Sequence, residues 1–102
     1  MRNNNSKEKK QEQVGRKWCQ LKQKEQIWIS SLLRDSYIKF VLERERKPSK
    51  SEKEFIVACA YLDIEDRGIG ITVNEVRKYF ESKIEKYNNS IIKAGLEPYN
   101  WK

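Results

Sequence analysis

The acidic residues Asp63, Glu65 and Asp66 form the only dense group of carboxylates in the chain, and such a group can bind a metal ion or transfer protons. A metal-dependent nuclease is one activity that this grouping suggests. The chain has no histidine and contains neither a G-x-S-x-G motif nor a phosphate-binding glycine loop. We therefore interpret the three acids as solvated residues at the end of a helix, and we expect neither an enzyme nor a cofactor.

The segment that starts at Asp63 resembles the calcium-binding loop of an EF-hand. Counted from Asp63, Gly68 falls at position 6, where that loop has its glycine. Arg67 falls at position 5, which requires an oxygen ligand, and Glu75 comes one residue too late to close the loop. These departures oppose calcium binding, and two distant cysteines without histidine oppose zinc, so we expect no metal site.

Positive charge is concentrated at the N-terminus. Residues 1–24 hold eight Lys or Arg and two acids, a net charge of +6, whereas residues 25–102 hold fourteen bases and thirteen acids, a net charge of +1. We interpret residues 1–15 as a flexible basic arm and residues 16–102 as a single helical domain. No apolar run suits an export signal or a membrane span, so we expect a cytoplasmic protein without a membrane partner and with reduced cysteines.

The apolar pattern predicts an all-α fold, a three-helix bundle with a docked C-terminal tail. The first helix runs from about Leu21 to Arg44 and is apolar nearly all round, which predicts that it lies in the middle of the domain. Its main face comprises Leu21, Trp28, Ile29, Leu32, Leu33 and Phe40. A second stripe comprises Ile27, Ile38 and Leu42, with Tyr37 and Val41 between the two.

Two further helices follow, each behind a capping box. Pro48 ends the first helix, and Ser49 with Glu52 predicts a second helix over about 50–65. Its expected inner face is Phe55, Ile56, Cys59 and Leu62. Thr72 with Glu75 predicts a third helix over about 73–94, ended by Gly95. Its expected apolar face is Val73, Val76, Phe80, Ile84, Tyr87 and Ile91. Ile69 and Ile71 between the glycines allow a short extended piece.

Three helices with a basic N-terminal arm resemble the homeodomain-type, helix-turn-helix-like arrangement, which implies an arm in the minor groove and a third helix in the major groove of DNA. The outward Glu81 and Glu85 would repel phosphates, so we expect the third helix first to form the core and to touch DNA through its first turn and basic flanks. The candidate nucleic-acid-binding residues are Arg2, Lys7, Lys9, Lys10, Arg16, Lys17, Asn74, Arg77, Lys78 and Lys86.

Two functions remain open from the sequence. The leading hypothesis is a small accessory DNA-binding protein, such as a regulator from a phage or mobile element, which holds phosphates largely without sequence preference. The alternative is a helical protein-interaction module, an adaptor or an inhibitor of a larger complex, with a homodimer as one form that it could take. Its candidate partner interface is Ile27, Ile38, Leu42, Tyr99 and Trp101.

Overall fold

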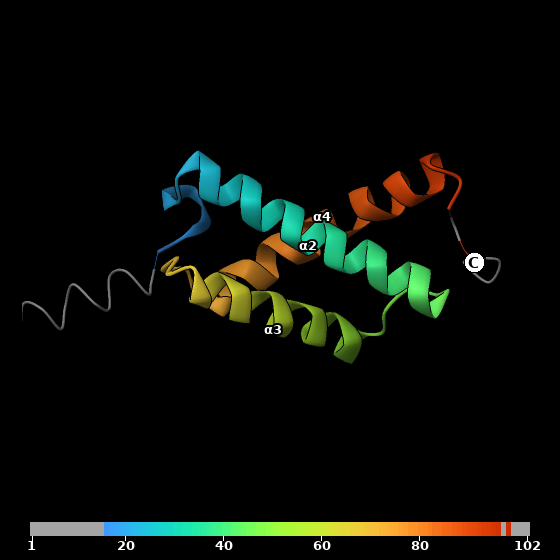
Figure 1. Cartoon of the computed structure of the whole chain (residues 1–102), viewed down its shortest axis with the longest axis horizontal. Helices are drawn as coiled ribbons and strands as arrows, with labels where there is room; N and C mark the ends of the chain where they lie inside the picture. Colours follow the sequence, from blue (N-terminus) through green and yellow to red (C-terminus); the bar gives the residue numbers. More distant parts are fainter. Residues whose placement is uncertain (1–15, 97, 99–102) are drawn as a thin grey trace, which may run out of the picture.

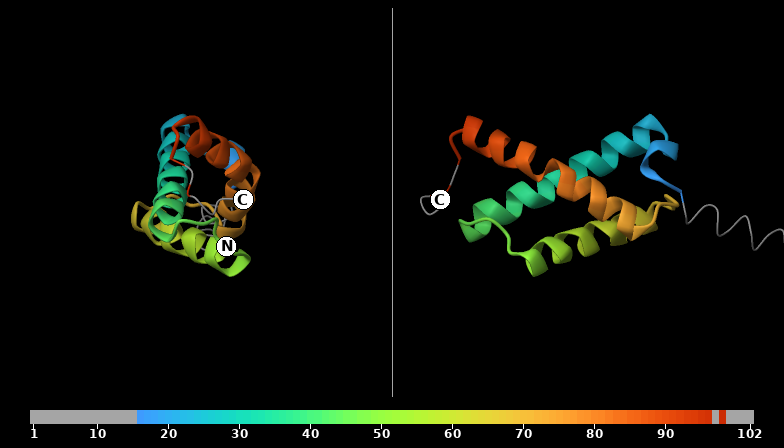
Figure 2. Two further views of the ribbon diagram at one scale, coloured as in Figure 1. Left: turned by 90° about the vertical axis from the view of Figure 1, so that its right-hand side faces the viewer. Right: turned by 180° about the vertical axis from the view of Figure 1, so that it is seen from behind.

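The computed structural model describes residues 16–96 and 98. A short 3-10 helix precedes three long helices, and the elements are η1 (Trp18–Gln20), α2 (Gln23–Arg44), α3 (Lys50–Asp66) and α4 (Val73–Lys93). All three long helices contact one another, and α4 crosses behind α2 and α3 (Figure 1, Figure 2). The predicted all-α three-helix bundle is confirmed.

The connection from α2 to α3 follows the residues that the sequence marks as breaks. Glu45 caps α2 in the left-handed region with a φ of 58°, and the buried Pro48 follows it. Ser49 accepts a hydrogen bond from the backbone N–H of Glu52 at 3.3 Å, and the Glu52 carboxylate accepts one from the Ser49 N–H at 2.8 Å. This reciprocal pair is the predicted capping box.

The turn from α3 to α4 contains the expected extended piece. Gly68 has a φ of 76°, and the next residue, Ile69, is buried. Ile71 then forms an isolated parallel bridge with Arg16, so the turn holds the segment in front of η1. Thr72 caps α4 through its side chain, which accepts from the N–H of Glu75 at 3.2 Å. The Glu75 carboxylate does not return to Thr72, so the second predicted capping box is only half formed.

The buried stripe of α2 differs from the predicted face. Ile29, Leu33, Tyr37 and Val41 are its buried residues, spaced one turn apart. Trp28, Leu32 and Phe40 were expected on the main face, but they lie at its edges and are half-buried. Because α3 and α4 both contact α2, the side chains that point between those two helices form the core.

The predicted inner face of α3 is wrong for three of its four residues. Phe55 and Leu62 each expose 66% of their surface, and Cys59 is also exposed. Ile56 is buried as expected, and the other buried residues of α3 are Val57, Ala60 and Ile64. The sequence of α3 carries two apolar stripes on opposite sides of the helix, and contact with α2 and α4 buries only the stripe that contains Ile56, Val57 and Ile64.

The third helix follows its pattern closely. Val76, Phe80, Tyr87 and Ile91 are buried, Ile84 is half-buried, and Val73 is the exception with 36% of its surface exposed. Val73 is the first residue of α4, where no earlier turn covers it. Gly95, with a φ of 71°, ends α4, because the Leu96 N–H turns back to the carbonyl of Ile91 at 3.0 Å. This is the predicted C-cap.

Candidate nucleic-acid interface

The described part of the chain begins with a strongly basic segment. Residues 16–24 contain four basic residues and no acid, and they form η1 and the first turn of α2. Lys17, Lys22 and Lys24 are exposed, whereas Arg16 is half-buried and lies 3.7 Å from the carboxylate of Glu25. We call Arg16, Lys17, Lys22 and Lys24 the basic end of the bundle. The predicted arm residues Arg2, Lys7, Lys9 and Lys10 lie outside the described residues.

Backbone contacts hold the basic end in place. The Arg16 N–H donates to the carbonyl of Gly70 at 3.2 Å, and the Trp18 N–H donates to the carboxylate of Glu75 at 3.2 Å. The side chain of Gln26 donates to the Trp18 carbonyl at 2.9 Å. The segment is therefore fixed to the α3–α4 turn, to α4 and to α2 at once, so its lysines project from a rigid support.

An open groove between α2 and α4 starts at the basic end. Its volume is about 390 Å³, and it is lined by Trp18, Gln23, Gln26, Ile27, Ser30, Ser31, Tyr79 and Lys83. The rings of Trp18 and Tyr79 stack with centroids 3.9 Å apart and planes inclined by 12°. The Tyr79 hydroxyl donates to Ser30 at 2.9 Å, which fixes the ring. The groove thus offers amide and hydroxyl groups beside a rigid aromatic pair.

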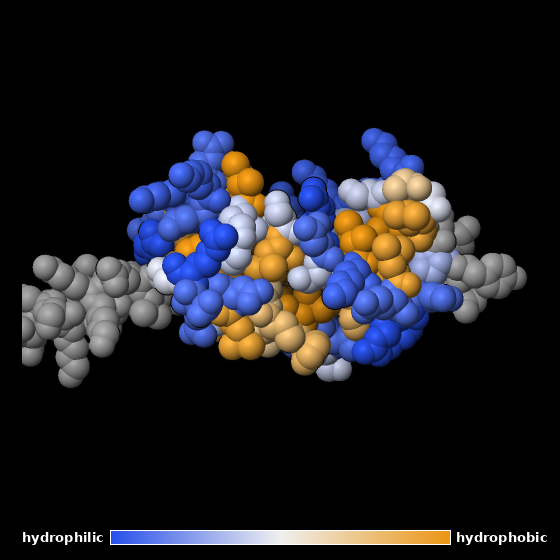
Figure 3. All heavy atoms as spheres, in the orientation of Figure 1, coloured by the Kyte–Doolittle hydropathy of each residue, from blue (hydrophilic) through white to orange (hydrophobic). Residues whose placement is uncertain are grey.

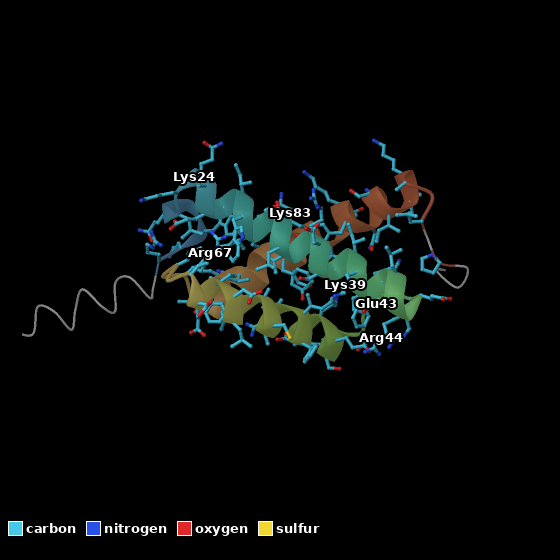
Figure 4. All side chains as sticks on the ribbon, in the orientation of Figure 1. Lys24, Lys39, Glu43, Arg44, Arg67 and Lys83 are labelled. Carbon is cyan, nitrogen blue, oxygen red and sulfur yellow. The ribbon has the colours of Figure 1, made fainter. Side chains whose placement is uncertain are left out.

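Lys83 adds a cation to this groove. Its ammonium nitrogen lies 5.5 Å from the centre of the Tyr79 ring, and Figure 4 shows Lys83 on the same side of the bundle as Lys24. The Lys83 side chain is half-buried and forms no ion pair among the described residues. Positive charge therefore extends from the basic end along the groove.

The predicted binding residues in the first turns of α4 are engaged within the protein. The Arg77 Nε lies 3.1 Å from the Glu54 carboxylate, and the Arg77 Nη1 donates to the side chain of Asn74 at 2.7 Å. Lys78 lies 3.1 Å from Glu75. Phosphate contacts by Arg77 or Lys78 would have to compete with these carboxylates, and Lys17 also interacts electrostatically with Glu75. Lys22 and Lys24 form no ion pair among the described residues.

The middle of α4 presents a mixed-charge surface. Glu81 lies 3.8 Å from Lys53 of α3, and both Glu85 and the predicted binding residue Lys86 are exposed. Two carboxylates on this surface oppose a close approach to phosphates. The structure therefore separates the predicted residues into two groups, with Arg16 and Lys17 at the basic end and the α4 residues elsewhere.

The acidic residues at the end of α3 are not gathered into a site. Among residues 16–96 and 98, no group of three or more Cys, Asp or Glu side chains is placed to share a metal ion. Arg67, which falls at a ligand position when the segment is aligned with a calcium-binding loop, is the C-cap residue of α3 (Figure 4). Its guanidinium carbon lies 4.1 Å from the centre of the Trp28 ring. Both cysteines are exposed and unbridged. The prediction that Cys59 lies in the core is wrong, because its side chain is exposed.

The predicted protein interface is present only in part. Ile27 and Leu42 expose 58% and 42% of their surfaces, whereas Ile38 is half-buried against the core. Tyr99 and Trp101 lie outside the described residues, and so does the predicted docking of the tail. Figure 3 shows further apolar surface near the C-terminal parts of α2 and α4, where Ile92 and Leu96 are exposed.

Sequence reasoning missed three contributors to the basic end and its groove. Lys22 and Lys24 entered the charge count of residues 1–24 but not the set of binding residues, although the acid-free run 16–24 was a visible signal. Lys83 is absent from the predicted binding residues, because no local pattern shows that α4 brings it into the groove beside Trp18.

Comparison of the chain with protein-family models, with curated proteins and with solved structures gives no match in any of the three. Within the described residues, no helix has the length and apolar character that crossing a membrane would need.

Proposed function

We propose that the protein binds nucleic acid, DNA in the first place, without sequence preference. The basic arm and the basic end neutralise phosphates, and the α2–α4 groove receives the neighbouring backbone. The observation that carries the proposal is the acid-free segment 16–24, whose three exposed lysines stand on a rigid support and which directly follows the basic residues 1–15 in the sequence. Lysines in this arrangement attract phosphates and release counterions from the nucleic acid.

The groove supports the same proposal through its chemistry. Lys83 can hold a phosphate while Gln23, Ser30 and Ser31 donate hydrogen bonds to phosphate or sugar oxygens. Trp18 and Tyr79 stack on each other, so they support the groove wall and are not free to take a base between them. Binding of this kind positions a nucleic acid without reading its sequence.

Fluorescence anisotropy with a labelled DNA duplex at low and high salt tests the proposal. Replacement of Lys22 and Lys24 by alanine removes two phosphate contacts, so we expect weaker binding at low salt and a slope of log K against log salt that is shallower by about 1.8. The matched control replaces Lys50 and Lys93, which are also exposed but belong to other helix ends, and it should behave as the unmodified protein. No binding even at low salt would refute the proposal.

A protein-interaction module remains the second candidate, because Leu42, Ile92 and Leu96 expose 42%, 44% and 49% of their surfaces. A photo-crosslinking amino acid at Leu42 should then give one defined adduct with a partner protein. The same amino acid at Lys50 should not give that adduct. Equal labelling from both positions would count against this candidate.

A further inference from the structure

The outward face of α3 is apolar although nothing in the described bundle covers it. Phe55 and Leu62 each expose 66% of their surface, and the small residues Ala58 and Cys59 between them are exposed as well. Their spacing places all four on one stripe, opposite the buried stripe of the same helix. Figure 3 shows apolar surface along α3, at the lower edge of the molecule. We call Phe55, Ala58, Cys59 and Leu62 the α3 face.

A groove adjoins the α3 face on the side of α2. It has a volume of about 400 Å³, and Phe40, Phe55, Ile56 and Cys59 form its apolar walls. Lys39, Glu43 and Arg44 also line it, and Figure 4 shows these three side chains together near the C-terminal end of α2. The face is therefore both apolar and hollowed, which suits the insertion of an apolar side chain.

We propose that a second copy of this chain covers the α3 face, with the two α3 helices antiparallel about a twofold axis that passes between Ala58 and Cys59. In that register Phe55 lies opposite Leu62 of the second copy, and Leu62 lies opposite its Phe55. The small residues meet at the centre, where the helices can approach closely, and the two large pairs fill the space on either side. A twofold interface requires such a self-complementary order of side chains.

Charge at the two ends of the face selects the antiparallel orientation. Beside the N-terminal half of α3, Lys39 and Arg44 outnumber the acid Glu43, and at its C-terminal end Asp63 and Asp66 outnumber Arg67. The charges that set the two ends apart are therefore Lys39, Arg44, Asp63 and Asp66. All four side chains are exposed, and none forms an ion pair within the described part of the chain. A twofold antiparallel pair brings the bases of each copy to the acids of the other. A parallel pair would place like charges together.

The dimer does not depend on the proposed nucleic-acid binding. The basic end belongs to η1 and the start of α2, whereas the α3 face is centred on the middle of α3. An antiparallel dimer leaves both basic ends uncovered and directs them away from each other. A failure to bind DNA would therefore not bear on the dimer, because the dimer is tested by the molecular mass in solution.

Sedimentation equilibrium of the full chain over a range of concentrations measures that mass. We expect a reversible monomer–dimer equilibrium, weakened about tenfold or more by Leu62→Lys, because the lysine would replace one member of each of the two large apolar pairs and lie against Phe55 of the second copy. The matched control is Ile27→Lys, which charges an exposed apolar residue of α2 away from the α3 face. A monomer at all concentrations, or equal weakening by both variants, would overturn the proposal.

Cys59 provides a positional test. Oxidation by diamide joins two thiols as a disulfide, and the diamide takes up the two hydrogens that the thiols lose. The Cys19→Ser chain should give a covalent dimer through Cys59 near the axis, whereas the Cys59→Ser chain, which keeps the exposed Cys19, should not. A covalent dimer from the second variant alone would place the contact elsewhere and overturn the register.

A charge exchange tests the orientation. Lys39→Asp should weaken the dimer several-fold, and the addition of Asp63→Lys should restore most of the affinity, because the opposite charges then face each other again in exchanged places. The control combines Lys50→Asp with Asp63→Lys, and in this pair the second substitution should not increase the affinity of the dimer. Dimers that neither single charge reversal weakens would contradict the antiparallel arrangement.

Discussion

The backbone N–H of Trp18 donates a hydrogen bond to the Oε1 of Glu75 across 3.2 Å, and this contact joins η1 to the first turn of α4. Glu75 also pairs with Lys78 at 3.1 Å. The Trp18 N–H and, after it, Lys78 lower the pKa of the Glu75 carboxyl from its ordinary value. An acid that the sequence assigns to a local cap thus holds the basic end of the bundle against α4.

The first prediction concerns the pH dependence of stability. Because the pKa of Glu75 is lower in the folded chain than in the unfolded chain, its contribution is present above the unfolded value of about 4.3 and is lost as the pH falls through the folded pKa. Glu75→Gln should therefore reduce the acid-dependent fall in the free energy of unfolding, measured by urea denaturation at several pH values.

The control for this prediction is Glu85→Gln. Glu85 is exposed on α4 and forms no ion pair among the described residues, so this variant should keep the pH dependence of the unmodified protein. If Glu75→Gln leaves the acid-dependent fall in the free energy of unfolding unchanged, the hydrogen bond from Trp18 does not lower the pKa of Glu75 in the folded chain.

Local signals in the sequence predicted the helices well. The Ser49–Glu52 capping box, the Thr72 cap and Gly95 mark helix ends through hydrogen bonds between near neighbours, so their outcome hardly depends on the rest of the chain. Helix α4 likewise has only one apolar stripe, which contains Val76, Phe80 and Ile91, and this stripe is buried. These features follow from short stretches of sequence alone.

The buried side of α3 could not be predicted in this way. The exposed stripe with Phe55 and Leu62 is about as large and as apolar as the buried stripe with Ile56 and Ile64, so no local signal decides which of the two packs against α2 and α4. The choice between two apolar stripes is made by tertiary packing. For the same reason the groove that joins Trp18, Tyr79 and Lys83 has no signature in the sequence.

The second prediction concerns Glu52, whose pKa is lowered to about 2 by the Arg46 guanidinium and by the Ser49 N–H. Arg46 donates two hydrogen bonds to this carboxylate, at 2.7 and 2.6 Å. Arg46→Ala removes the largest cause, so the titration midpoint of the Glu52 carboxyl carbon in NMR should move upward toward 4.3. Arg34→Ala, which removes a more exposed arginine on α2, should leave it unmoved.

The third prediction concerns two residues with left-handed backbones. Glu45 has a φ of 58° and Gly68 a φ of 76°. A side chain strains this conformation, so Glu45→Gly should raise the free energy of unfolding by about 1 kcal/mol and Gly68→Ala should lower it by about 1 kcal/mol. No atom lies within 4 Å of a Cβ at Gly68, so strain alone is measured there. Changes of the same sign in urea denaturation would contradict the argument.

The fourth prediction separates two buried tyrosines of one aromatic cluster. The Tyr37 hydroxyl donates to the side chain of Asn88 at 2.7 Å, whereas the buried Tyr87 hydroxyl has no hydrogen-bond partner among the described residues. Burial raises the pKa of both phenols, so neither is ionised near neutral pH. Tyr37→Phe leaves Asn88 without its donor and should lower the free energy of unfolding by about 1–2 kcal/mol.

Tyr87→Phe is the matched variant, because it removes the same oxygen from the same core. Its hydroxyl is desolvated without compensation, so its loss should be neutral or should stabilise the fold by up to about 1 kcal/mol. The ring contacts of Tyr87 with Tyr37 and Phe80 remain in the variant, so a difference between the two variants reports on the hydroxyl groups. Equal losses in urea denaturation would show that the hydrogen bond to Asn88 contributes nothing to stability.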